Sequence, residues 1–145
     1  MRKTSVTDIV VGFALGLVVA LLILRSQYES MPPLSYFTPV PLVALAAVEF
    51  VLARRIRGAV GHDPETKLIP AIAVARSAAL GKASALTAGI VLGASVALLL
   101  RVGSELSTVT AAQHDAIVAV LTLIAAASLL AAGLVLEHSA LIPPD

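Results

Sequence analysis

The sequence predicts an all-α, polytopic integral membrane protein in which four transmembrane helices form an up-down bundle. Three observations carry this prediction: an excess of apolar residues, four long apolar runs, and an uneven placement of the basic residues between them. Hydrophobic residues make up 59% and charged residues 13% of the 145 residues, against roughly 45–50% and about 25% in soluble domains. A soluble protein of this length has too little interior to bury so much apolar surface. We therefore expect a single membrane domain over residues 1–145.

The four apolar runs have lengths suited to a bilayer. They are Ile9–Leu24, Pro39–Ala53, Ala83–Leu100 and Ala116–Leu136. At 1.5 Å per residue they extend roughly 22 to 31 Å, against a hydrocarbon core of about 30 Å, so the first two runs need flanking residues. We expect transmembrane helices at about 7–25, 38–54, 80–101 and 115–137. No small-residue cleavage pattern follows the first run, which predicts an uncleaved anchor.

The basic residues predict the orientation. Eight lie before the first run or between the second and third, and two lie in the other connections: Arg2, Lys3, Arg54, Arg55, Arg57, Lys67, Arg76 and Lys82 against Arg25 and Arg101. Cytoplasmic loops of membrane proteins carry the excess of Lys and Arg. We therefore expect a multi-pass plasma-membrane protein with both termini and the loop 54–79 in the cytoplasm. Residues 70–81 either continue the third helix, which we favour, or lie along the inner leaflet and bend at Gly81.

Small residues recur every four positions in two of the expected helices. In the first helix they include Gly12 and Gly16, and in the third they are Gly81, Ala85, Gly89, Gly93 and Ala97. Such spacing predicts a face on which helix backbones approach closely, and packing within one chain is favoured over a dimer seam. The motifs GFALG and GIVLG, each followed by a similar apolar stretch and one arginine, also suggest a weak internal repeat with an axis along the membrane normal.

Glu49 is an acidic residue within the second apolar run. It lies five residues before Arg54, which places it roughly 7–8 Å deeper than the arginine cluster. The favoured interpretation is an ion pair with Arg76 or Lys82 of the neighbouring helix. A coupling site for proton or cation transport and an unpaired carboxylate that reaches the interface are the alternatives.

Several classes of function are not indicated. A net charge of +1 gives no field for nucleic acid. The chain has no cysteine, and its histidines, His62, His114 and His138, fall on both membrane faces, so we expect no metal, cofactor or catalytic site. His114 and Asp115 have the pattern of a helix start. The connection that contains Pro32 and Pro33 predicts a rigid turn rather than a ligand site.

Three segments resemble a known family: SMPPLSYFTPVP, AAVEFVLARR and AVARSAALGKASALTAGIVLGA. They are similar to small four-helix actinobacterial membrane proteins, catalogued as domain of unknown function 3180, whose genes often lie beside folate-biosynthesis genes. The resemblance covers nearly the whole chain and implies that Glu49, Arg76 and Lys82 are positions that the family keeps. The tail LEHSALIPPD departs from it, because it lacks the Cys and Arg of relatives.

The sequence alone favours a non-enzymatic accessory or scaffold protein that acts through helix–helix association. Its partners would be the lipid bilayer and either a second copy or another membrane protein. The alternative is a small dimeric transporter coupled to protons or cations through Glu49, although five aromatic residues are few for a substrate cavity. A membrane enzyme is the third class.

Overall fold

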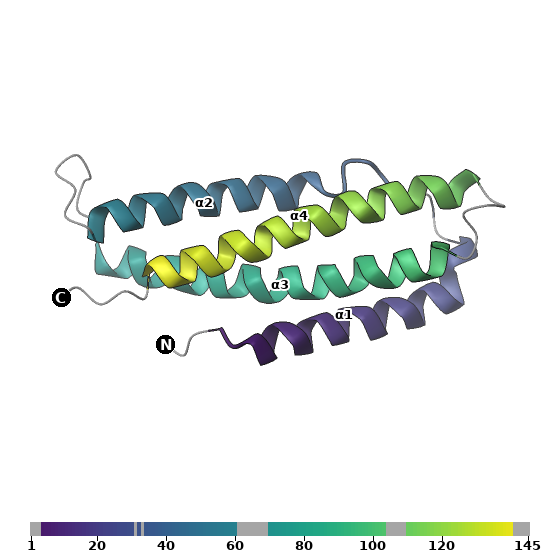
Figure 1. Ribbon diagram of the computed structural model, residues 1–145, viewed down its shortest axis with the longest axis horizontal. Coiled ribbons are helices and arrows are strands. Elements are labelled where there is room, and N and C mark those ends of the chain that lie inside the picture. The colour runs from purple at the N-terminus through teal and green to yellow at the C-terminus, as the bar shows by residue number, and fades with distance from the viewer. Residues whose placement is uncertain (1–3, 31, 33, 61–69, 104–109, 141–145) are drawn as a thin grey trace.

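The computed structural model describes residues 4–30, 32, 34–60, 70–103 and 110–140 of the chain, and in this part the fold is all-α, as predicted (Figure 1). The elements in order are α1 (Val6–Gln27), the short 3₁₀-helix η1 (Tyr28–Ser30), α2 (Val40–Val60), α3 (Ala71–Gly103) and α4 (Thr110–Ala140). Successive helices run in opposite directions, so α1 and α3 begin where α2 and α4 end. We call that end the arginine end, after the arginines of α2, and the opposite end the proline end, after Pro32.

The helices extend beyond the predicted apolar runs. At its start α1 has a capping box, in which the Ser5 hydroxyl accepts a hydrogen bond from the Thr7 N–H and the Asp8 carboxylate accepts one from the Ser5 N–H. α3 is one helix from Ala71, so residues 71–81 do not form a separate segment. α2 continues to Val60, which puts Arg54–Arg57 on the helix instead of in the expected loop 54–79. Residues 61–69 of that loop lie outside the described residues.

Three of the four helices are long and apolar enough to cross a membrane. The qualifying segments are Val6–Gln27, Ile72–Gly103 and Ala112–Ala140. α2 is the exception, because Glu49 and the three arginines near its end fall within its 21 residues. The three qualifying helices indicate a membrane protein.

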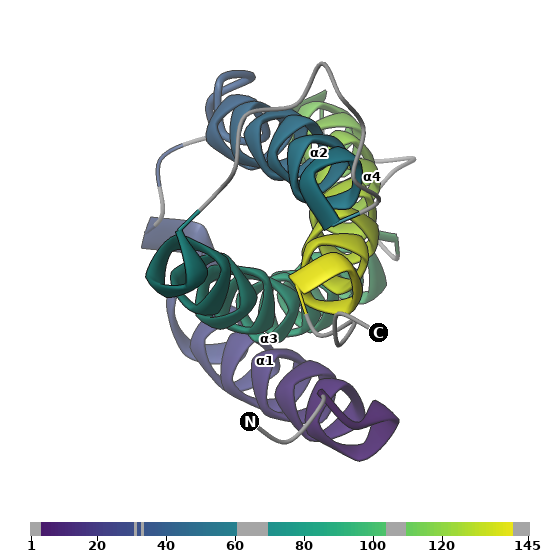
Figure 2. The ribbon, with the colours of Figure 1, turned by 90° about the vertical axis from the view of Figure 1, so that its left-hand side faces the viewer.

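The helices are not arranged as a closed four-membered ring. In space their order is α1, α3, α4, α2, with α1 packed on α3, α3 on α4, and α4 on α2 (Figure 2). The apolar core lies between α2, α3 and α4, where Ala88 and Leu129 form part of one cluster and Ile56 and Leu136 part of a second. α1 is consequently an outlying helix, and along its length only Gly16 and Leu24 are buried.

Glycines allow α1 and α3 to touch backbone to backbone. A Cβ atom added at Gly16 would overlap the carbonyl oxygen of Ile90, and one added at Gly93 would overlap that of Phe13. The two motifs GFALG and GIVLG therefore face each other in the structure. Close approach of this kind gains dispersion contacts that lipid cannot replace.

The small residues of α3 pack against two helices, α1 and α4. The expectation that they form a single packing face is therefore wrong. Gly89 and Gly93 lie against α1, whereas Gly81 lies against Gly133 of α4, with a Cβ at Gly81 only 2.6 Å from the Gly133 carbonyl oxygen. The reason is geometric: each step of four residues turns the position by about 40° around the helix, so three steps turn it by about 120°. Two further members of the series, Ala85 and Ala97, are fully buried.

Candidate functional site

Glu49 lies on the face of α2 that enters the core. The buried residues Ala46, Glu49, Ala53 and Ile56 follow one another at steps of three, four and three residues, as expected for one stripe of a helix. The exposed fraction of Glu49 is 0%. The helical register therefore carries this carboxylate into the bundle instead of towards the surface.

The two oxygens of Glu49 have different surroundings. Oε1 accepts a hydrogen bond from the hydroxyl of Ser84, which is itself buried on α3. Oε2 is buried and has no hydrogen-bond partner among the described residues. It lies beside the backbone of α4, because a Cβ atom at Gly133 would be 3.5 Å from it. The carboxylate thus occupies a position where α2, α3 and α4 meet.

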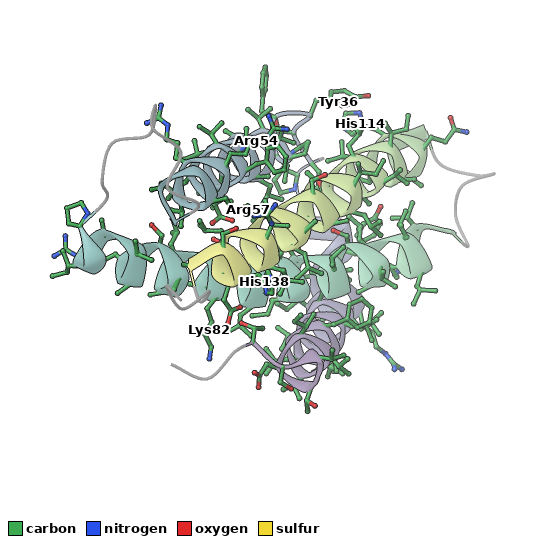
Figure 3. The ribbon with its side chains drawn as sticks, turned by 60° about the vertical axis from the view of Figure 1, so that its left-hand side comes forward. Tyr36, Arg54, Arg57, Lys82, His114 and His138 are labelled. Atoms are coloured by element: carbon green, nitrogen blue, oxygen red, sulfur yellow. The ribbon has the colours of Figure 1, made fainter. Side chains whose placement is uncertain are left out.

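The structure gives Glu49 a partner other than the predicted cations. The Ser84 hydroxyl donates to Oε1, and no described residue bonds Oε2. Arg76 is exposed on α3, and Lys82 extends from α3 away from α2 (Figure 3). The physical reason is rotation about α3: Ser84 is two residues beyond Lys82, which turns it by about 200°.

Other polar groups join helices at the arginine end. Glu137 of α4 is buried, and its Oε1 accepts a hydrogen bond of 2.6 Å from the backbone N–H of Thr4, just before α1. Arg57 of α2 donates from Nε to the Ser139 hydroxyl of α4 at 2.9 Å, and that hydroxyl donates to the Val135 carbonyl. The bonds of Glu137 and Arg57 connect segments that are distant in the sequence. The polar side chains at this end therefore link helices to one another.

At the proline end, two residues expected only to begin a helix hold the connection between α1 and α2. Asp115 has an exposed fraction of 7%, and its carboxylate accepts hydrogen bonds from the Tyr28 hydroxyl at 3.1 Å and the Leu34 N–H at 3.2 Å. His114 Nε2 lies 2.7 Å from the Leu34 carbonyl oxygen. Its ring also packs edge-on against Tyr36, with centroids 4.3 Å apart (Figure 3).

Sequence reasoning missed three of these residues for different reasons. Ser84 is a single hydroxyl among apolar neighbours, and only its place in the register of α3 shows that it faces α2. Gly133 stands alone in α4 without a spaced partner. Asp115 follows His114 at a helix start, where an acidic residue is ordinary. The structure brings no group of three or more metal-ligating side chains together in the part of the chain that it describes.

One protein family matches the chain. Its description is "Protein of unknown function (DUF3180)", and the match covers residues 9–144. The chain belongs to this family. Membership confirms the resemblance carried by the proline loop and the segments around Glu49 and Gly89, and the family's description names no activity. No curated protein and no solved structure matches the chain.

Proposed function

We propose that all four helices cross the plasma membrane, with the arginine end and both termini on the cytoplasmic side. α2 packs beside α4, which is one of the three qualifying helices, and runs parallel to it. Its 21 residues extend about 31 Å, close to the hydrocarbon thickness of about 30 Å. The orientation follows from the basic residues, because eight of the ten belong to the arginine-end segments.

We further propose that this DUF3180 protein is a non-enzymatic accessory or scaffold subunit that acts through helix association. The observation that carries the proposal is the position of α1, which packs on α3 through its glycine face and makes no comparable helix contact with α2 or α4 in the described part of the chain. Its remaining surface presents large apolar side chains, among them Val18 and Leu22. The buried polar side chains support the non-enzymatic role, because Glu137 and Asp115 use their carboxylates in hydrogen bonds that link segments of the chain.

Site-specific photo-crosslinking tests this proposal. A photoreactive residue at Val18 of α1 is compared with one at Val48 of α2; these positions have exposed fractions of 52% and 60%. The proposal predicts protein adducts from Val18 in native membranes, either with a second copy or with another membrane protein, and mainly lipid adducts from Val48. Lipid adducts alone from Val18, together with a monomer in nanodiscs, would contradict it.

A second candidate function is supported by the unpartnered Oε2 of Glu49. An ionisable group inside a membrane bundle is expensive, and such groups frequently serve ion or proton transport. In this view Glu49 binds the coupling proton or cation of a small transporter. The test is proton and cation flux in reconstituted vesicles with Glu49→Gln, which keeps an acceptor for Ser84, and Glu137→Gln as the matched control. Flux lost only in Glu49→Gln supports transport, and equal flux in all three proteins rejects it.

A further inference from the structure

α1 and α3 leave a cavity between them at the proline end. The two helices touch at Gly16 and Gly93, and beyond this contact small side chains, Ala20 and Ala94, line a cavity of about 410 Å³. Ile23 and Leu98 continue its apolar wall. A volume of this size is at the lower end of the range of small-molecule sites, roughly 300–1,000 Å³.

Hydrogen bonds fix the far wall of this cavity. Tyr28, Leu34 and Asp115 all line it, and the Asp115 carboxylate accepts hydrogen bonds from the Tyr28 hydroxyl and the Leu34 N–H. His114 adds a third polar contact, to the Leu34 carbonyl oxygen. The described part of the connection is therefore attached to α4 beside the cavity, so the wall is formed before any ligand arrives.

The guanidinium carbon of Arg101 lies 5.1 Å from the centroid of the Tyr28 ring, whereas the cavity itself is lined by Asp115. Asp115 is the one ionisable carboxylate among the described residues that line the cavity. A carboxylate offers about four lone-pair sites, and Tyr28 and Leu34 use two of those on Asp115. The remaining sites can accept from a donor in the cavity, and a cationic donor forms a stronger hydrogen bond than a neutral one.

We propose that the cavity binds an amphipathic molecule with an alkyl body and a primary ammonium end. The alkyl body lies against Ala20, Ile23, Ala94 and Leu98, and the ammonium donates to Asp115. Two sources share this chemistry: a free alkylamine, and a membrane lipid with an ethanolamine headgroup. The proposal is independent of helix association and of transport through Glu49.

Binding of decylamine and decanol to the full chain in phosphatidylcholine nanodiscs tests the proposal, with native mass spectrometry and tyrosine fluorescence as readouts. We expect decylamine to bind about tenfold more tightly than decanol, the ratio expected when a charge-assisted hydrogen bond replaces a neutral one. Adding phosphatidylethanolamine to the nanodiscs identifies the source: competition with decylamine indicates the lipid, and unchanged binding indicates a free amine. Equal binding of decylamine and decanol would overturn the proposal.

Three variants test where and how the ligand binds. Ala20→Leu fills the cavity, whereas Ala14→Leu makes the same change at an exposed position of the same helix. We expect Ala20→Leu to weaken decylamine binding about tenfold or more and Ala14→Leu to leave it unchanged. Asp115→Asn should remove the preference for decylamine over decanol. Unchanged binding in Ala20→Leu would place the ligand elsewhere and overturn the proposal.

Discussion

The two outer helices, α1 and α2, attach to the bundle by different means. α1 meets α3 through glycines that bring the two backbones together. α2 meets α4 along an apolar face and is joined to its neighbours by side-chain hydrogen bonds, Glu49 to Ser84 and Arg57 to Ser139. In an apolar solvent hydrophobic burial does not drive helices together, so close packing and polar bonds are the forces that remain. Along the helices themselves, close packing dominates the contact of α1, and side-chain hydrogen bonds are added at the contacts of α2.

The largest effect on helix packing is expected at Gly16, where the backbones of α1 and α3 are in contact. Gly16→Ala puts a methyl group on the carbonyl oxygen of Ile90, and overpacking of this kind costs typically about 1–3 kcal/mol. We expect α1 to move away from α3. The measurement is the distance distribution between spin labels on cysteines introduced at Val18 and Leu100, which should broaden and shift.

Gly12→Ala is the matched control for that experiment. It adds the same methyl group to the same helix, but its nearest neighbour, the Leu86 carbonyl oxygen, would be 3.4 Å away. The distribution should stay close to that of the unmodified chain. If both variants shift it equally, helix propensity explains the effect and the glycine contact does not.

An effect of similar size is expected when the hydrogen bond between α2 and α3 is removed. Ser84→Ala removes the donor to Oε1 and leaves both buried oxygens of Glu49 without a partner, which costs about 1–3 kcal/mol of unfolding free energy. Ser128→Ala removes an exposed hydroxyl that bonds only its own helix, at the Ile124 carbonyl, and should change little. Unfolding in mixed micelles measures both. Equal stability of the two variants would show that the link does not stabilise the bundle.

A smaller effect is expected when a hydrogen bond at the proline end is removed. Tyr28→Phe removes one of the two hydrogen bonds that Asp115 accepts, while the Leu34 N–H retains the other; one such bond contributes about 0.5–1.5 kcal/mol. Hydrogen exchange of the Leu34 amide should therefore accelerate by a few-fold to about tenfold. Tyr36→Phe keeps the ring contact with His114 and should leave that exchange rate unchanged. Faster exchange of the Leu34 amide in Tyr36→Phe than in Tyr28→Phe would contradict the assignment of Asp115 as the residue that holds this connection.

The smallest effect, and of opposite sign, is expected at Gly103. A Cβ atom at this position meets no described atom within 4 Å, so packing does not require the glycine. Alanine is a better helix former than glycine by up to about 1 kcal/mol in a helix interior, and less at a terminus. Gly103→Ala should therefore raise the melting temperature slightly. A loss of stability would indicate that small residues matter in this chain for reasons other than close contact.

The difference between the two helices also explains what the sequence could predict. The contact of α1 with α3 repeats every four residues, so Gly12, Gly16, Gly89 and Gly93 were predictable as packing positions. The partner of Glu49 was not, because one serine at the right rotation of α3 leaves no periodic signal. The order α1, α3, α4, α2 was hidden for a related reason: hydropathy predicts that helices exist and alternate in direction, but not which of them become neighbours.

Whether α2 crosses the bilayer can be tested directly, because the chain has no native cysteine. Single cysteines are introduced at Ser35, on the proline-end connection, and at Arg55, at the arginine end; both positions are exposed. Intact cells are then treated with a membrane-impermeant maleimide. We expect Ser35→Cys to react from outside and Arg55→Cys to react only after permeabilisation. Reaction of both positions from the same side in intact cells would contradict it.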